Sequence, residues 1–386
     1  MKRIAAVLAF LVACGPERPP EVALPPAPPA PSADPSPPSP HVVIAAPDAG
    51  APAAPVSTDP ALPPAKPTTI ALARTGDDKL DPILAQGDKA FEDGDYAKAL
   101  AAYEAAKKQA PKKAAPVVGV ARVRVAKASP SLGFAAAEKN VEVLAASKDL
   151  KRATDMEPTF GPAHVELGRA QLLLGDAPNA EAALRKGARL LPDDAEAHSA
   201  LGIALLAGGK TEEALTELSR ARDLDPGSAP RRGNLGTVLF MRGRVADAIK
   251  EYEIEVRITP DDARAHSDLG TALLAQSDFT RAVPELERAI QLDPKRATFR
   301  SNLGYALQLS GKVTEAIAQY REALKLDAKL ASAWINLATA LARDPKTRGE
   351  ARQALKTAAN LDPSDPRVKA NLEELDALER GGPPKP

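Results

Sequence analysis

The residue with the most specific chemistry in this chain is its single cysteine, Cys14. Because no second cysteine is present, an internal disulfide, a thiolate zinc site and a CxxC redox pair are excluded. Lys2 and Arg3 precede a short apolar run, Ile4 to Val12, which is too short to span a bilayer as a mature helix. This pattern predicts a signal peptide over residues 1–13.

Three histidines raise the question of a metal site. His164, His198 and His266 occupy the same place in a 34-residue pattern described below. Equivalent positions of stacked helices lie at least about 8 Å apart, whereas the ligands of one zinc ion must each approach to about 2 Å. We therefore expect these histidines to pack between helices, and we predict no metal.

The motifs of common enzymes do not occur. Gly208-Gly209-Lys210-Thr211 resembles the end of a phosphate-binding loop, but the required first glycine is replaced by Ala204. No HExxH, GxSxG or dinucleotide fingerprint is present, and the many carboxylates alternate with basic residues along helical faces. The sequence therefore predicts a non-enzymatic protein without catalytic residues, cofactor or small-molecule substrate.

Composition divides the chain into two parts. The 51 basic and 51 acidic residues balance, so no net field favours nucleic acid as a partner. Nineteen of the 38 prolines lie between Pro16 and Pro67, in a Pro/Ala/Ser-rich stretch that cannot bury a core. We expect residues 14–79 to form a disordered, extended tether, and residues 381–386 a disordered tail.

The remainder of the chain is an internal repeat with a period of 34 residues. The first set of equivalent residues is Pro158, Pro192, Pro226, Pro260 and Pro294. The second is Leu167-Gly168, Leu201-Gly202, Leu235-Gly236, Leu269-Gly270, Leu303-Gly304 and Leu337-Ala338. The third is Ala180, Ala214, Ala248, Ala282 and Ala316. Three columns with one period predict a repeat architecture.

These residues resemble the tetratricopeptide repeat (TPR) family, whose unit is an antiparallel pair of helices, A and B. The resemblance implies an all-α, right-handed α-solenoid. Small residues at positions eight and twenty would let the two helices approach, proline would end helix B, and Gly175, Gly209, Gly243 and Gly311 would close helix A, with Ser277 replacing glycine once.

The repeat pattern sets the expected boundaries. One unit covers residues 80–113, a degenerate unit with an insertion covers 114–160, and six units cover 161–365, starting at residues 161, 195, 229, 263, 297 and 331. An amphipathic helix over 366–380, with Val368, Leu372, Leu375 and Leu378 on one side, is expected to cap the solenoid.

A second resemblance concerns the cysteine. Leu11-Val12-Ala13-Cys14 is similar to the bacterial lipobox, which implies a lipid on Cys14 and the membrane as a partner. Gly15 replaces the aspartate that retains enteric lipoproteins in the inner membrane, so the resemblance implies an outer-membrane lipoprotein that faces the periplasm. The alternative is an unmodified cysteine in an ordinary signal sequence.

Position six of the repeats is the expected binding site, since in the TPR family it lines the concave groove. The column reads Glu166, Ala200, Asn234, Asp268, Asn302 and Asn336, beside Thr237, Thr271 and Tyr305. Asparagine both donates and accepts hydrogen bonds, so a column of asparagines could pair with the backbone of an extended peptide, as in the TPR domains of O-linked sugar transferases. The alternative is that Asn-Leu-Gly is family consensus with a structural role only.

Together these observations predict a protein–protein interaction scaffold of the cell envelope that binds an extended peptide in its concave groove. Three alternatives stay open: a pilotin-like assembly factor for an outer-membrane secretin, an accessory subunit of an envelope enzyme complex, and a structural spacer without a ligand.

Overall fold

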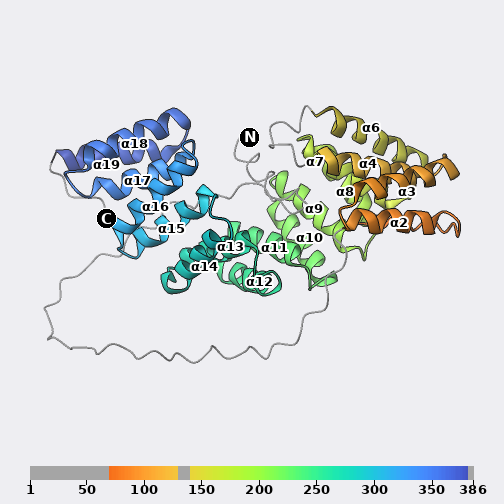
Figure 1. Ribbon diagram of the computed structural model, residues 1–386, viewed down its shortest axis with the longest axis horizontal. Coiled ribbons are helices and arrows are strands. Elements are labelled where there is room, and N and C mark those ends of the chain that lie inside the picture. Colours follow the sequence, from red (N-terminus) through yellow and green to blue (C-terminus); the bar gives the residue numbers. More distant parts are fainter. Residues whose placement is uncertain (1–68, 129–139, 381–386) are drawn as a thin grey trace, which may run out of the picture.

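The computed structural model describes residues 69–128 and 140–380. This part of the chain contains 17 α-helices and no strand, arranged along a curved path (Figure 1). The predicted signal peptide, Cys14, residues 15–68 of the tether and the tail 381–386 lie outside it. Within the same described part, no helix has the length and apolar character needed to cross a membrane.

The helices alternate between A and B helices of successive pairs. The A helices are α2 (Asp81–Glu92), α4 (Ala114–Ala128), α7 (Gly161–Leu173), α9 (Ala195–Ala207), α11 (Ala229–Met241), α13 (Ala263–Ala275), α15 (Ala297–Leu309) and α17 (Ala331–Ala342). The B helices are α3 (Tyr96–Gln109), α6 (Val141–Met156), α8 (Ala177–Leu190), α10 (Thr211–Leu224), α12 (Val245–Ile258), α14 (Phe279–Leu292), α16 (Val313–Leu326) and α18 (Arg348–Leu361). The last helix is α19 (Pro366–Glu379). The predicted α-solenoid of helix pairs is confirmed.

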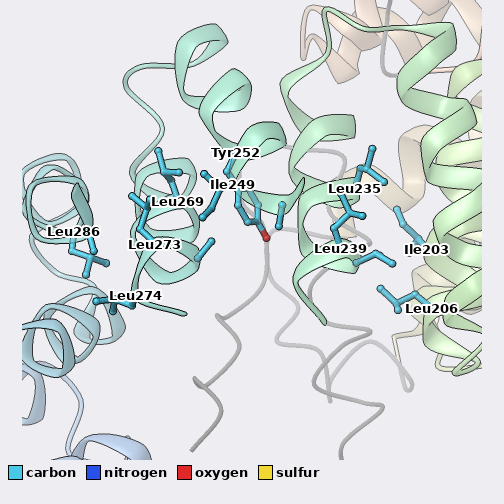
Figure 2. Packing of buried hydrophobic residues seen from close by; sticks show 14 of the residues in the cluster. Ile203, Leu206, Leu235, Leu239, Ile249, Tyr252, Leu269, Leu273, Leu274 and Leu286 are labelled. Atoms are coloured by element: carbon cyan, nitrogen blue, oxygen red, sulfur yellow. The ribbon is translucent and has the colours of Figure 1, made fainter. Parts of the chain in front are cut away.

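The close approach of A and B helices depends on position eight. A Cβ atom added at Gly236 would lie 2.7 Å from Cε1 of Tyr252, and one added at Gly168 would lie 2.4 Å from Cγ of Leu184. Real Cβ atoms do not approach so closely, so a larger residue would push the helices apart. Figure 2 shows Tyr252 among the buried aliphatic side chains that fill this space.

The turns after six A helices need a left-handed backbone, and one of them is Gly94 after α2, with φ 74°. Gly175, Gly209, Gly243 and Gly311 have φ between 73° and 83°, and Ser277 adopts φ 60° at the equivalent position. Only glycine reaches this region without a steric cost. The expectation that these residues close helix A, with serine as the exception, is confirmed.

The curvature of the stack places the A helices on its inner side. Most successive A helices contact each other directly, as α7 and α9 or α13 and α15 do. Successive B helices in the described chain make no comparable contact. Helices on the inside of a curved stack are closer together than those on the outside, so the A helices form the concave wall (Figure 1).

Both irregular ends of the predicted array form regular structure. Helices α4 and α6 pack as an A/B pair, which agrees with a degenerate repeat, while residues 129–139 of the insertion lie outside the described chain. At the other end, Val368, Leu375 and Leu378 of α19 are buried against the last repeat. Helix α19 therefore packs on the last repeat, at the place where the capping helix was expected.

The predicted boundary of the tether is wrong. Residues 69–79 were expected to belong to it, but Ile70 and Leu72 are fully buried. These two aliphatic side chains, two residues apart in an otherwise polar and small-residue context, are sufficient to dock the segment on the folded domain. The tether therefore does not extend to residue 79.

Candidate functional site

The concave wall is built from two positions of each A helix, six and nine, and we call this surface the inner wall. Position six of α7 to α17, and of α19, is Glu166, Ala200, Asn234, Asp268, Asn302, Asn336 and Asn371. Position nine of α2 to α17 is Asp88, Arg122, Arg169, Ile203, Thr237, Thr271, Tyr305 and Thr339.

Position nine of one A helix meets position six of the next. The amide of Asn302 donates to the hydroxyl of Thr271 at 3.4 Å, and that of Asn371 donates to Thr339 at 3.3 Å. Arg122 and Glu166 make the same pairing with charged groups. The inner wall is therefore a ladder of side-chain contacts that joins neighbouring repeats.

In the first repeats this ladder is charged and buried. Asp88 lies 3.4 Å from Arg122, and Arg122 lies 2.9 Å from Glu166. The ladder continues from Arg169 to Glu196 at 3.3 Å, a pair that reaches from α7 to α9. Buried charges need partners of opposite sign, and here successive helices supply them.

The ladder then crosses to α11. Glu196 lies 3.3 Å from Arg231, which is 2% exposed and bonds Asp225 at 2.5 Å and Ser228 at 3.0 Å. The charged ladder thus extends over five A helices, from α2 to α11. Removing one partner of such a buried pair is destabilising, because it leaves an uncompensated charge.

The charges of the ladder control one another's protonation. Burial by itself raises the pKa of Glu166, but the positive charges of Arg122 and Arg169 outweigh it and lower the net pKa below its ordinary value of 4.5. Burial also opposes the charge on Arg122, but Glu166, Tyr103 and Asp88 outweigh that effect and raise its pKa. Both side chains therefore stay ionised at neutral pH.

Residues 69–74 lie across this charged wall as an irregular segment that bends at Leu72, where the backbone amide of Arg74 donates to the carbonyl of Leu72 at 2.8 Å. Asp88 accepts hydrogen bonds from the backbone amides of Leu72 at 2.6 Å and of Ala73 at 3.2 Å. Arg122 donates to the backbone carbonyl of Ile70 at 2.6 Å. Side chains of the inner wall thus bind the main chain of a crossing segment.

The ends of this segment are fixed by further polar contacts. Arg74 lies 2.9 Å from Asp194 at the start of α9, and the hydroxyl of Thr69 donates to Glu92 at 3.1 Å. A pocket of about 220 Å³ remains beside the segment; its lining includes Ala71, Glu196 and Arg231.

The structure places most of the predicted site residues on the inner wall. Asn234, Asn302, Asn336, Thr271 and Tyr305 are partly exposed there. Burial raises the pKa of the Tyr305 hydroxyl, so it stays protonated at neutral pH.

Two predicted site residues are buried. Asp268 is only 7% exposed. The hydroxyl of Thr237 donates to the carbonyl of Gly233 at 2.9 Å and accepts from the Tyr252 hydroxyl at 3.2 Å. Because Tyr252 belongs to helix B, Thr237 joins the two helices of its repeat. The assignment of Thr237 to the binding groove is wrong.

The histidines at position four hold the turn that precedes their own repeat. His198 bonds the carbonyl of Pro192 through Nε2 at 2.9 Å and Glu217 through Nδ1 at 2.6 Å, and His266 repeats both contacts with Pro260 and Glu285. His164 bonds the carbonyl of Pro158 at 3.0 Å. Burial of its ring lowers the pKa of His164.

In two repeats without a histidine at position four, another side chain at that position bonds the turn that precedes the repeat. Arg232 bonds the carbonyl of Pro226 at 2.9 Å, and the indole N–H of Trp334 donates to the carbonyl of Ala328 at 2.9 Å. The contacts of the histidines are therefore structural. In the part of the chain that the structure describes, no group of His, Cys, Asp and Glu is arranged to hold a metal ion.

The charged ladder was not predicted from the sequence. A signal for it was present, because Arg122 interrupts the apolar run from Val117 to Val123, and Asp88 and Arg169 occupy the same repeat position. A charged residue on the buried side of a helix indicates a charged partner nearby. The partners could not be read from one repeat, since they lie on neighbouring ones.

Comparison with protein families agrees with this geometry. The family model for the tetratricopeptide repeat matches residues 136–195, 166–229, 200–263, 267–331 and 310–366, together more than half of the chain. The chain therefore belongs to the tetratricopeptide repeat family, whose members are generally non-enzymatic and bind protein or peptide partners. Its fold is consistent with a protein-interaction scaffold. Among curated protein sequences, none matches this chain.

Solved structures share the fold. A chain of the APC/C hetero-tetramer Cut9–Hcn1 aligns with a TM-score of 0.58 and 17% identity, over 79% of this chain and 57% of that chain. PilF of Pseudomonas aeruginosa aligns with a TM-score of 0.48 and 20% identity, over 55% of this chain and 97% of that one. YrrB, described as a TPR protein with an unusual peptide-binding site, aligns with a TM-score of 0.39 and 23% identity, over 49% and 97%. At these identities the likeness concerns the fold alone.

Proposed function

We propose that this protein is a non-enzymatic scaffold of the cell envelope that binds an extended segment of a partner protein. The binding surface is the inner wall of α11 to α19. A lipid on Cys14 holds the protein at the outer membrane, and the solenoid faces the periplasm.

The observation that carries this proposal is the position of the chain's own residues 69–74. They cross the inner wall without forming a helix or strand, and their main chain is bonded by Asp88 and Arg122, both at position nine. The inner wall of α11 to α19 has the same register but carries amides and hydroxyls in place of most charges. It is therefore suited to bind a main chain in the same way.

The chemistry of that wall favours a sequence-tolerant partner site. An asparagine amide has two donors and an acceptor, and one donor of Asn302 bonds the Thr271 hydroxyl. Asn234, Asn336 and Asn371 repeat the same group along the stack. Peptide backbone offers donors and acceptors at regular spacing, whatever its side chains.

A scaffold fits this chain better than an enzyme does. A catalytic site needs titratable groups that converge on a cavity with unequal roles. The most deeply buried ionisable groups here, such as Arg122 and Glu166, instead neutralise each other between helices. The balance of 51 basic and 51 acidic residues also gives no preference for nucleic acid.

The envelope location rests on the sequence before the folded domain. The basic start, the apolar run and the lipobox resemblance at Leu11-Val12-Ala13-Cys14 support lipid attachment. The Pro-rich residues that follow, up to residue 68, support a long tether between membrane and solenoid.

Site-specific photocrosslinking tests the proposed surface. A photoreactive residue at Ser332, on A helix α17, should crosslink a defined partner in intact cells, whereas one at Thr314, exposed on B helix α16, should not. Equal crosslinking from both positions, or crosslinking from Thr314 alone, contradicts the proposal.

A further inference from the structure

We propose that the inner wall of the first repeats is a second binding site, specific for a non-helical segment with two aliphatic residues two positions apart and an arginine two positions further on. Residues 70–74 of this chain fill the site in cis, and a segment with the same pattern fills it in trans when the cis segment is displaced. This site is separate from the wall of α11 to α19, so the inference goes beyond the proposed function.

The first argument is main-chain recognition. Three hydrogen bonds, from Leu72 and Ala73 to Asp88 and from Arg122 to Ile70, bind the main chain of three of the residues 70–73, which belong to no helix or strand. The two side chains that form them are themselves held in place. Asp88 accepts from the Tyr103 hydroxyl at 2.8 Å, and Arg122 is fixed by Glu166. A preorganised site of this kind binds a peptide without reordering its own groups.

The second argument is side-chain recognition. Ile70 and Leu72 are fully buried, while Ala71 and Ala73 between and after them are partly exposed. The segment therefore buries its two aliphatic side chains although its backbone bends at Leu72 and is not a strand. Ile70 joins the apolar cluster formed mainly by α7 to α19, and Leu72 joins the cluster formed by α2 to α7. The site thus requires two aliphatic groups at a fixed spacing.

The third argument is the arginine contact. Asp194 uses Oδ1 to accept from the amides of Glu196 and Ala197 at the start of α9, and uses Oδ2 to bind Arg74 at 2.9 Å. The carboxylate is therefore oriented before a ligand arrives. Because Arg74 is 41% exposed, this contact contributes selectivity more than affinity.

A short turn explains why the cis segment occupies the site. Thr75 and Gly76 donate their backbone amides to Asp81 at 3.0 and 3.1 Å, and Gly76 adopts φ 73°. The turn returns the chain from the start of α2 to the inner wall. Such a short connection gives the segment a high effective concentration, so a peptide in trans competes poorly with it. In the intact chain this half of the wall is closed to partners.

The test uses a labelled peptide of residues 68–76 and the full-length chain. In the double variant Ile70→Asp, Leu72→Asp the cis segment cannot dock, and the peptide should bind it saturably and at least ten times more tightly than it binds wild type. A peptide carrying the same two aspartates should bind at least ten times more weakly, and one carrying Arg74→Ala should bind two to five times more weakly. A variant with wild-type circular dichroism that shows no saturable binding overturns the proposal.

A second measurement serves if the double variant does not fold. A protease site inserted after Gly76 allows the folded chain to be cut there, which converts the cis segment into a trans ligand. Excess peptide of residues 68–76 should then displace the N-terminal fragment, and the aspartate-substituted peptide should not. A fragment that no peptide displaces, or that both peptides displace equally, contradicts a specific site. Photocrosslinking from Ser332 tests partner binding to the wall of α11 to α19 independently of these two experiments.

Discussion

The Nε atom of Arg122 lies 3.0 Å from a carboxylate oxygen of Glu166, and this contact joins position nine of α4 to position six of α7. The same register joins Thr271 to Asn302 and Thr339 to Asn371. One geometric rule therefore produces a charged ladder at the start of the solenoid and an amide–hydroxyl ladder at its end. The chemistry of the inner wall changes along the stack, while its backbone geometry does not.

The charged ladder should make stability depend on pH through Glu166. Although burial opposes its charge, Arg122 and Arg169 lower the pKa of Glu166 in the folded state below 4.5. The resulting stability is fully present above pH 4.5 and is lost as the pH falls through the lowered folded-state pKa. Glu166→Gln should cost about 1–3 kcal/mol at pH 7, because Arg122 then keeps only the more distant carboxylate of Asp88 and faces a neutral amide in place of Glu166. Urea unfolding at pH 7 and at pH 3 should show a smaller difference between variant and wild type at the lower pH; an unchanged difference would exclude this role.

The fold could be predicted from the sequence because the repeat signal is local and recurs. Gly236 and its equivalents at position eight, the turn glycines and the helix-ending prolines each carry a physical constraint at a fixed spacing. The site could be predicted only in part. Asn302 and Thr271 lie on the inner wall, but their mutual contact depends on the rotation between repeats, which one repeat does not encode.

The misplaced residues have physical reasons as well. Thr237 was assigned to the groove from its position in the repeat. Its hydroxyl accepts a hydrogen bond from the Tyr252 hydroxyl, so Thr237 takes part in the contact between the two helices of its own repeat. In the segment before α2, composition indicated a tether up to residue 79. The overall composition of this segment is typical of a tether. Burial of its two aliphatic side chains, Ile70 and Leu72, against the wall nevertheless holds it on the folded domain.

The contact between A and B helices should be intolerant at position eight. A Cβ at Gly236 would meet the Tyr252 ring at 2.7 Å, so Gly236→Val should cost about 1–3 kcal/mol by overpacking. Gly349 is a matched control, since it is helical and a Cβ there would meet nothing within 4 Å. Gly349→Ala should stabilise the protein by up to about 1 kcal/mol through helix propensity. Thermal unfolding followed by circular dichroism separates the two, and equal effects would mean that position eight is not the contact.

Ser277 adopts a strained backbone conformation that a substitution by glycine should relieve. Its φ of 60° is the conformation that glycine adopts at Gly243 and the other equivalent turns, and Ser277 is exposed. Ser277→Gly should therefore stabilise the chain by up to about 1 kcal/mol, and Gly243→Ser should destabilise it by a similar amount. Melting temperatures should move in opposite directions; a fall for both variants would contradict the role of the backbone.

The anchor has a direct chemical test. If Cys14 is acylated, a labelled fatty acid should enter the wild-type protein and not Cys14→Ser, which should accumulate in its unprocessed form. Gel fluorography with a size comparison measures both effects. Equal labelling of the two proteins would remove the lipid from the proposal and leave the binding surface unaffected.

The central claim, that the inner wall of α11 to α19 binds a partner's backbone, is tested most directly by removing its amides. The triple variant Asn234→Ala, Asn302→Ala, Asn336→Ala should lose hydrogen bonds to the partner worth about 0.5–1.5 kcal/mol each. Capture of the crosslinked partner should therefore weaken by roughly 30- to 1000-fold. Because the three residues are partly exposed, the melting temperature should stay within about 3 °C of wild type.

The matched control carries Thr314→Ala, Gln353→Ala and Asn360→Ala, three polar residues exposed on the B helices. It should keep both the wild-type affinity and the wild-type melting temperature. The decisive measurement is the dissociation constant of the partner for both triple variants, taken beside their thermal unfolding. The account predicts a large loss of affinity for the inner-wall variant alone, with its stability preserved. Wild-type affinity in a folded inner-wall variant, or an early melt that accounts for the loss, contradicts it.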